Sequence, residues 1–268
     1  MFLLFDIGST RMRVGVSEDL AKLDRYEIYN TPRDYRAALE LVKSFAGEEK
    51  IQRVAGCIPG FVSKDGVIER SGNLPEWRGE KIVDDLVSIF GIKPMIDNDA
   101  VLANLGEWEF GAGKGADHLA YLTISTGIGG SITYQGKVLP RLTSFEPGQQ
   151  IIYYKDRIER MENIASGRMI LSRYGGGADK LSNEEAWVEI EKNLSILIHN
   201  LICFWSPERL VLGGGVVEFG KLNFDRISAS LESTLPKIRI PQILPAELGA
   251  IGGLYGGLYL LRNIRTLV

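Results

Sequence analysis

The amino-acid sequence predicts an α/β fold organised in two lobes. Strand-like and helix-like patterns alternate on both sides of a glycine-rich stretch, GAGKGAD, at residues 111–117. Each half begins in the same way, with an apolar strand, a turn of Gly, Ser and Thr residues, and a second strand. The chain has 268 residues, 45% of them hydrophobic, which is enough to build a core in each lobe.

In the first half, the spacing of apolar residues distinguishes strands from helices. Period-two spacing and short buried runs indicate strands, and apolar positions three or four residues apart indicate helices. The strands are expected at residues 2–7, 11–17, 24–29, 51–58 and 93–96. The helices are expected at residues 33–47, 79–90 and 99–110.

The second half repeats this alternation and closes with a glycine-rich apolar segment. Strands are expected at 118–125, 128–134 and 209–213, and helices at 160–173, 183–204 and 247–263. The segment LGAIGGLYGGLYLL, residues 248–261, is too short and too rich in glycine to span a membrane. A buried helix that other elements approach closely is the better interpretation.

Composition and charge exclude several classes of function. A net charge of −3 does not favour a nucleic-acid partner or an anionic membrane surface. Two cysteines, Cys57 and Cys203, do not form a disulfide framework, so we expect a reducing, cytoplasmic environment. A structural zinc site needs four close thiol or imidazole ligands, and the two Cys and two His residues are far apart.

Two turns carry residues suited to phosphate. Gly8-Ser9-Thr10 separates the first two strands. The residues Ser125, Thr126, Gly127, Gly129 and Gly130 lie in and around the turn between the strands at 118–125 and 128–134. Glycine lets a phosphate approach the backbone, where N–H groups can bind it. Neither turn has the spacing G-x-x-x-x-G-K-[ST], and an ordinary hairpin turn remains the alternative for each.

Asp6 lies near the end of an apolar strand, two residues before the first turn. A hairpin has no need of an acid there. A carboxylate does not bind phosphate, but it can hold a magnesium ion, directly or through water, that bridges to the phosphate. Asp6 and the two turns together therefore predict a magnesium-assisted phosphate site.

Asp97 and Asp99 flank Asn98 where a predicted strand ends and a helix begins. Capping of that helix by Asn98 or Asp99 is the simple explanation, but it accounts for only one acid. In open α/β sheets, ligands bind at the carboxyl ends of strands. A carboxylate at this edge can accept a proton from a hydroxyl nucleophile, as phosphoryl transfer requires.

Two further segments suit a sugar and a nucleotide. RSGNLPEWRG, residues 70–79, contains Asn73, whose amide both donates and accepts hydrogen bonds, as sugar hydroxyls require. A surface loop over Trp77 is the alternative. LVLGGGV, residues 210–216, is a strand followed by three glycines, which allow a flat ligand such as a nucleotide base to approach. An ordinary strand-to-helix turn is the alternative there.

In this order and at these separations, the motifs resemble the ROK family of sugar kinases and related repressors, in the actin–hexokinase superfamily. The resemblance extends from Phe2 to the closing helix. It implies a two-lobed actin/hexokinase-like (ribonuclease H-like) fold, with the active site in the cleft between the lobes. The small lobe would comprise residues 1–112 joined by the C-terminal helix at 250–268, and the large lobe residues 113–249.

The resemblance implies roles for the residues that match the family's motifs. Asp99 takes the place of the catalytic base, and Asp6 that of the magnesium residue, acting through water. The implied substrate-binding residues are Asn73, Asn98, Asp99, Glu146, Gln149 and Glu162. The implied phosphate- and nucleotide-binding residues are Asp6, Gly8, Ser9, Thr10, Arg11, Thr126, Gly127, Gly129, Gly130, Gly213, Gly214 and Gly215.

The chain departs from the family pattern in two places. Ser9 and Arg11 replace the usual residues of the first phosphate loop, D-I-G-G-T-K. Gln149 stands where the family has a His tied to zinc, and YYKDRIERMENIASG, residues 153–167, contains no cysteine. Glu162 and the segment Ala165-Ser166-Gly167 still match, so we expect a variant that has lost the zinc module.

The implied function is ATP- and Mg²⁺-dependent phosphorylation of a hexose or N-acetylhexosamine hydroxyl, the 6-hydroxyl being favoured. The resemblance also implies a homodimer, since members of the family are often dimers. Loss of the His and the zinc loop leaves a second interpretation open, a non-catalytic regulator that binds a sugar or nucleotide. A third keeps the sugar kinase and replaces ATP with polyphosphate.

Overall fold

The computed structural model describes residues 1–72, 74–141 and 144–263. These residues form two compact units, each with its own sheet. Unit 1 contains Met1–Phe110, Ser144 and the residues from Ala250 onward. Unit 2 contains Gly111–Arg141 and Phe145–Gly249.

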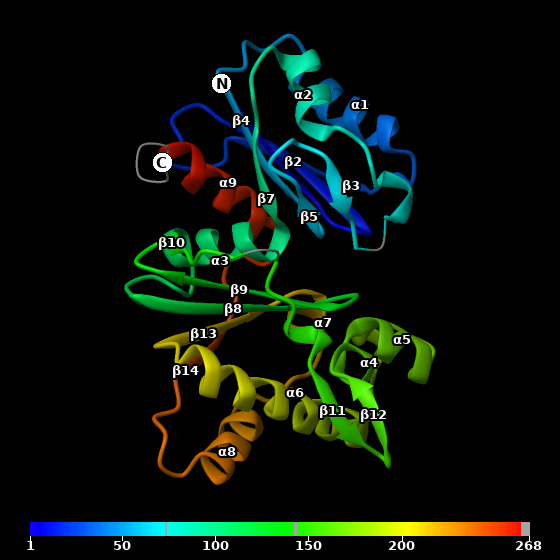
Figure 1. The fold of residues 1–268 in the computed structure, drawn as a ribbon, viewed down its shortest axis with the longest axis vertical. Helices are drawn as coiled ribbons and strands as arrows, with labels where there is room; N and C mark the ends of the chain where they lie inside the picture. Colours follow the sequence, from blue (N-terminus) through cyan, green and yellow to red (C-terminus); the bar gives the residue numbers. More distant parts are fainter. Residues whose placement is uncertain (73, 142–143, 264–268) are drawn as a thin grey trace. The chain divides into compact units, whose positions relative to one another are not determined.

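The sheet of unit 1 has five strands in the described chain, in the order β3-β2-β1-β4-β7 (Figure 1). β1 pairs antiparallel with β2 and parallel with β4, and β4 pairs parallel with β7. These strands are β1 (Phe2–Ile7), β2 (Arg11–Ser17), β3 (Arg25–Asn30), β4 (Arg53–Ile58) and β7 (Met95–Asn98). A small ribbon of β5 (Phe61–Val62) and β6 (Ile68–Arg70) follows β4.

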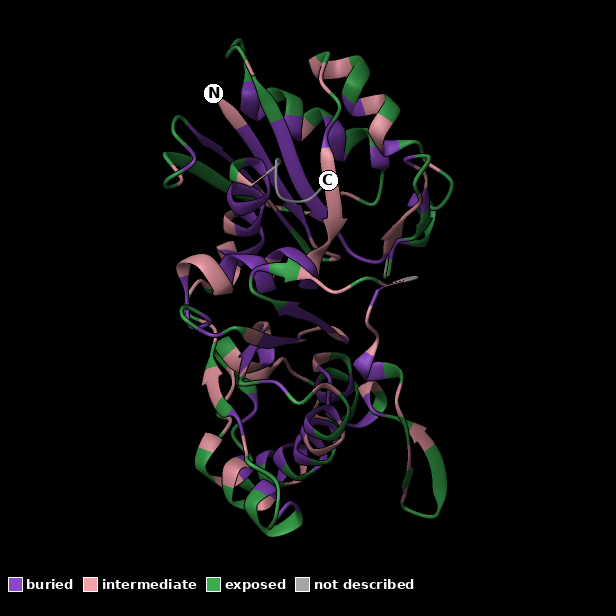
Figure 2. Ribbon diagram, turned by 60° about the vertical axis from the view of Figure 1, so that its left-hand side comes forward, coloured by how far each residue is buried: buried purple, intermediate pink, exposed green. Residues whose placement is uncertain are grey.

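Helices cover both faces of this sheet. α1 (Tyr35–Ala46) and α2 (Ile82–Phe90) lie on one side, and α9 (Gly252–Arg262) lies on the other (Figure 1). Successive strand residues point to opposite faces, so Leu3 and Phe5 pack with α1 and α2, whereas Leu4 packs with α9. Figure 2 shows the central strands of the sheet as buried.

α9 packs closely against α3 (Asp99–Phe110) because both helices carry glycine at the contact. A Cβ on Gly256 would lie 1.9 Å from the carbonyl oxygen of Leu102, and one on Gly106 would lie 2.4 Å from that of Gly252. On another side of α9, a Cβ on Gly253 would lie 2.7 Å from Cγ of Asp6. The closing segment is thus a buried helix, as the sequence predicts.

The sheet of unit 2 has the order β10-β9-β8-β13-β14 in the described chain. Numbered within each sheet, both orders are 3-2-1-4-5, so the similar openings of the two halves reflect a shared topology. The strands of the unit 2 sheet are β8 (His118–Ile124), β9 (Ile128–Tyr134), β10 (Lys137–Val138), β13 (Arg209–Gly213) and β14 (Gln242–Pro245).

Helix α6 (Glu184–Trp205) runs through the core of unit 2 and begins at the cap residue Asn183, whose side chain accepts from the amide of Ala186. The remaining helices are α4 (Glu162–Ala165), α5 (Gly167–Tyr174), α7 (Gly215–Phe219) and α8 (Phe224–Thr234). The 3-10 turns are η1 (Pro75–Trp77), η2 (Pro147–Gln149), η3 (Ala178–Lys180) and η4 (Gly249–Ile251).

The structure corrects two predicted helices. The helix expected at 160–173 is divided into α4 and α5, because Ser166 has an extended backbone and caps α5 through the amide of Met169. The helix expected from residue 247 begins only at Gly252, after η4, where Gly249 has φ +50°.

A hairpin of β11 (Ile151–Tyr154) and β12 (Arg157–Arg160) precedes α4 and was not predicted. All four residues of β11 are apolar or aromatic, which hides the period-two signal. No helix in the described part of the chain is long and apolar enough to cross a membrane.

Candidate functional site

Asp6 is buried on the α9 face of the unit 1 sheet, with only 8% of its surface exposed. Its Oδ1 accepts from the thiol of Cys57 at 3.3 Å, and its Oδ2 lies 3.5 Å from Nη1 of Arg13. Burial raises the pKa of Asp6, and the charge of Arg13 and the Cys57 hydrogen bond oppose this rise. The sequence predicts an acid at the end of this strand; its burial and its two partners were not predicted.

The turn after Asp6 is stabilised by hydrogen bonds that its carbonyl groups accept. The amide of Gly8 donates to the carbonyl of Arg11 at 3.0 Å. Thr31 donates from Oγ1 to the Gly8 carbonyl at 2.7 Å and from its amide to the Thr10 carbonyl at 3.0 Å. Within the described residues, the amides of Ser9 and Thr10 have no partner, so this turn has donors available for an anion.

Arg11 opens β2 with an exposed side chain, and Arg13, two residues further along the same strand, pairs with Asp6. The Nε of Arg13 is buried and has no partner in the described part of the chain. The sequence motif points to Arg11, whereas the arginine beside Asp6 in the structure is Arg13. Register could have revealed it, because Arg13 lies directly opposite Asp6 in the β1–β2 pair.

Asn98 and Asp99 stand at the junction of β7 and α3, at the carboxyl end of a parallel strand. Asn98 donates from Nδ2 to the carbonyl of Gly60 at 3.0 Å, and its Oδ1 accepts from the amide of Ala100 at 3.0 Å. Asp99 Oδ1 accepts from that same amide at 2.9 Å. Both side chains therefore contribute to the helix cap.

Helix capping does not explain the electrostatics of Asp99. Its pKa is raised from 3.8 to about 7, first by burial and then by the negative charge of Asp6, while hydrogen bonds at Ala100 and Asn98 oppose the rise. Asp6 and Asp99 are thus brought close enough to interact although they lie far apart in the sequence. Such a carboxylate can accept a proton near neutral pH.

Asn73 lies outside the described residues. Its neighbour Gly72 has φ +57°, and a Cβ there would lie 3.8 Å from Oγ of Ser9 and 3.4 Å from Cβ of Pro59. Gly72 therefore lies beside the first turn.

The second turn, Ser125-Thr126-Gly127, joins β8 and β9 in unit 2. The amide of Ser125 donates to the carbonyl of Gly127 at 2.9 Å. Gly129 and Gly130 lie beyond the turn, inside β9, opposite Thr123 and Leu122. A Cβ on Gly130 would lie 2.9 Å from Cγ of Pro147, so this glycine lets η2 pack against the strand.

η2 and α4 bring two of the predicted sugar-binding residues together. Gln149 Nε2 donates to Glu162 Oε1 at 2.9 Å. Glu146 precedes η2, and its carbonyl accepts from the amide of Gln149 at 3.0 Å. A Cβ on Gly127 would lie 3.2 Å from Glu162 Oε2, so this carboxylate lies beside the second turn.

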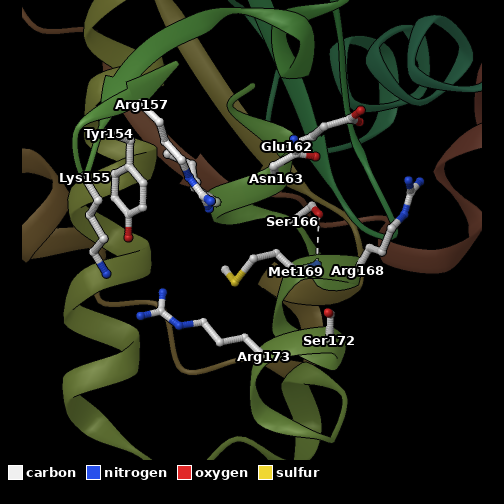
Figure 3. Close-up of a pocket in the computed structure, with 11 residues that line it drawn as sticks. Tyr154, Lys155, Arg157, Glu162, Asn163, Ser166, Arg168, Met169, Ser172 and Arg173 are labelled. Atoms are coloured by element: carbon white, nitrogen blue, oxygen red, sulfur yellow. Dashed lines mark hydrogen bonds between the residues drawn. The ribbon is translucent and has the colours of Figure 1, made fainter. Parts of the chain in front are cut away.

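A cavity of about 480 Å³ lies between the β11–β12 hairpin and α4 and α5. In Figure 3, Tyr154, Lys155 and Arg173 lie on one side of it, and Glu162 and Arg168 extend to the other. Lys155 and Arg173 both pair with Glu189, at 2.9 and 3.0 Å, and Tyr154 also bonds to that carboxylate. These contacts join both the hairpin and α5 to Glu189 on α6.

Two of the three glycines at the end of β13, Gly213 and Gly214, pack against β8. A Cβ on Gly213 would lie 2.2 Å from the hydroxyl of Tyr121, and one on Gly214 would lie 2.6 Å from the carbonyl of Ile124. Gly214 has φ +88°, and Gly215 begins α7. Close packing explains why residues 213 and 214 are glycines. Gly215 has the most space around it of the three.

This chain is similar to known proteins over most of its length. The ROK family model matches residues 3–140 and 156–264. A glucokinase of Thermotoga maritima is 35% identical over 50% of this chain and 44% of its own length. An N-acetyl-D-glucosamine kinase of Aliivibrio salmonicida is 25% identical over 97% of this chain and 99% of its own.

A solved structure supports the fold independently. The ROK family glucokinase from Streptomyces griseus, in complex with glucose and AMPPNP, has a TM-score of 0.80 and 22% identity. The match covers 96% of this chain and 98% of the other. The predicted α/β, actin/hexokinase-like fold is thereby confirmed, and the extent of the family match shows that this chain belongs to the ROK family.

Proposed function

We propose that the protein is a sugar kinase that transfers the γ-phosphate of ATP to a hydroxyl of a hexose or N-acetylhexosamine, the 6-hydroxyl being favoured. The observation that carries this proposal is Asp99, an acid with a pKa of about 7 at the carboxyl end of a parallel strand. The similar proteins named as glucokinase and N-acetyl-D-glucosamine kinase support the substrate class. The nucleotide AMPPNP in the similar glucokinase structure supports ATP as donor.

In this mechanism Asp99 accepts the proton of the sugar hydroxyl as its oxygen attacks the γ-phosphorus. A positioned base contributes roughly 10²–10⁴-fold to such a step. The free amides of Ser9 and Thr10 bind phosphate oxygens, and the amides of Thr126 and Gly127 are the corresponding phosphate donors of unit 2. These donors stabilise charge on the transferred group.

The sugar is bound by side chains whose oxygens and amides suit hydroxyl groups. Glu162, oriented by Gln149, accepts from ring hydroxyls. Asn73, Asn98 and Glu146 complete the proposed set of sugar-binding residues. Gly213 to Gly215 form the nucleotide side, with Gly215 the position that leaves most room for a ligand.

The donor set of Asp6 fits magnesium. A carboxylate is a hard oxygen ligand, and Mg²⁺ commonly takes one or two carboxylates together with phosphate oxygens and waters. Asp6 would hold the ion through water. When bound, the ion neutralises charge on the transferred phosphate.

We also propose that the protein acts without zinc, because Gln149 replaces the family's His and residues 153–167 contain no cysteine. Activity should then survive a zinc-selective chelator when Mg²⁺ is supplied. The homodimer and the cytoplasmic location remain predictions.

A phosphotransfer assay over a panel of hexoses and N-acetylhexosamines, with ATP or polyphosphate as donor, tests the function. We expect turnover of at least one sugar with ATP. Turnover with polyphosphate alone would replace the proposed donor. Sugar binding by calorimetry without turnover on any sugar would refute the kinase and favour a regulator.

A further inference from the structure

The junction between α4 and α5 holds the second turn by its carbonyl groups. The amide of Gly167 donates to the carbonyl of Ser125 at 2.7 Å, and the amide of Arg168 donates to that of Thr126 at 3.2 Å. The Oγ of Ser166 accepts from the amide of Met169 at 3.3 Å, as the dashed line in Figure 3 shows. The proposed mechanism gives Ser166 and Gly167 no role.

The N-terminal amides of a helix lack partners within the helix. At α5 these amides all have partners within the protein. Two donate to carbonyl groups of the turn, and one donates to the side chain of Ser166. The amide of Ile170 makes a helical bond to the Ser166 carbonyl. The N-terminus of α5 therefore binds the turn and is not itself a binding site for phosphate.

This docking decides which way the turn's donors point. In a trans peptide the C=O of one residue and the N–H of the next point in opposite directions. The carbonyls of Ser125 and Thr126 point at α5, so the amides of Thr126 and Gly127 point away from it. In the described chain neither amide has a hydrogen-bond partner.

Gly167 is the residue that allows the turn to pack against the N-terminus of α5. A Cβ at this position would lie 2.7 Å from the carbonyl oxygen of Ser125 and 3.2 Å from its carbon. Such a contact is with backbone and cannot be relieved by a rotamer change, so any side chain at residue 167 moves the turn.

The same short segment also carries Glu162, four residues before Ser166. The Glu162 carboxylate lies beside Gly127, where a Cβ would come within 3.2 Å of Oε2. A ligand that fixes the Glu162 carboxylate therefore also restricts the turn.

We propose that residues 162–168 form a positioning segment, in which Gly167 aims the amides of Thr126 and Gly127 at the donor phosphate. The segment also couples the sugar held by Glu162 to the affinity for donor. Gly167 is a positioning residue, because it acts through the turn. This inference rests on the proposed kinase function.

The test compares Gly167→Ala with Ser166→Ala. Both variants disturb the same helix end, but only Gly167→Ala displaces the Ser125 carbonyl. We expect Gly167→Ala to lower kcat/KM for ATP by roughly 10²-fold, the usual effect of a displacement of about 1 Å, through a raised KM. Sugar affinity measured without nucleotide stays close to wild type, and Ser166→Ala keeps most of its kcat/KM for ATP.

A second readout is the effect of the sugar on AMPPNP affinity, measured by calorimetry. In the wild type we expect saturating sugar to change this affinity by roughly 5-fold or more, and Gly167→Ala should reduce that change. If Gly167→Ala keeps the wild-type KM for ATP, or if both variants lose sugar and donor affinity alike, the inference is overturned. An inactive wild type would instead refute the proposed function.

Discussion

Gln149 donates a hydrogen bond from Nε2 to Oε1 of Glu162 at 2.9 Å, across thirteen residues of sequence. The ROK family pattern has a histidine at the position of Gln149, so here a neutral amide orients the carboxylate instead. An amide does not titrate near neutral pH, and it leaves Oε2 of Glu162 beside Gly127.

Removal of this amide should weaken sugar binding. We expect Gln149→Ala to raise KM for the sugar by about fivefold, equivalent to about 1 kcal/mol for one hydrogen bond, with little change in kcat. Gln149→Glu should be worse, because it places a second negative charge against Glu162. A wild-type KM for the sugar in Gln149→Ala would show that Gln149 does not orient the carboxylate.

Asp99→Asn should lower turnover by roughly 10²–10⁴-fold while sugar binding is largely kept. An asparagine keeps the oxygen that accepts from the amide of Ala100, so the helix cap survives. Steady-state kinetics and calorimetry with the sugar measure the two effects separately. The control variant Asp97→Asn, two residues earlier, removes the same charge and should lower turnover far less. Near-normal turnover in Asp99→Asn would contradict the assignment of Asp99 as the base.

The raised pKa of Asp99 predicts the acid side of the pH profile. A base must be unprotonated, so kcat/KM for the sugar should fall about tenfold per pH unit below a pKa of about 7. Asp6→Asn should shift this limb to lower pH, because the Asp6 charge raises the pKa of Asp99. A wild-type profile flat from pH 5 to 8 would contradict the assignment.

Asp99 should also make folding stability depend on pH. Its folded pKa of about 7 lies above the unfolded value of 3.8, so the native state binds more protons between these values. Stability contributed by the protonated form is therefore lost as pH rises through this range, by at most about 1.4 kcal/mol per pH unit. Denaturant unfolding of metal-free protein at pH 5 and pH 8 should show this slope in the wild type and a smaller one in Asp99→Asn. Parallel pH profiles for the two proteins would refute it.

The contact between α9 and α3 predicts different costs for neighbouring glycines. In Gly256→Ala the new Cβ would lie 1.9 Å from the backbone oxygen of Leu102, and we expect a loss of about 3 kcal/mol or more. In Gly257→Ala it would meet the end of the Leu4 side chain at 2.8 Å, and the better helix propensity of alanine offsets part of the cost. The melting temperature measured by calorimetry should therefore be much higher for Gly257→Ala than for Gly256→Ala. The reverse order would refute this packing.

Local patterns predicted much of the fold correctly. The strands at 2–7 and 11–17 and the helix at 99–110 have the predicted bounds, because alternating or helical spacing and short glycine turns act over a few residues. The predicted helix at 160–173 failed at Ser166. Its break depends on a cap and on bonds to Ser125, more than forty residues away in the sequence.

The sequence by itself determined which chemical groups are present: an acid before a glycine turn, acids around Asn98, a second Ser-Thr-Gly turn, and a glutamine in place of a histidine. Only the tertiary structure decided what surrounds them. Burial beside Asp6 raises the pKa of Asp99, and Arg13 reaches Asp6 through strand register. These effects arise from distance and desolvation between residues remote in the chain, which spacing along a sequence does not encode.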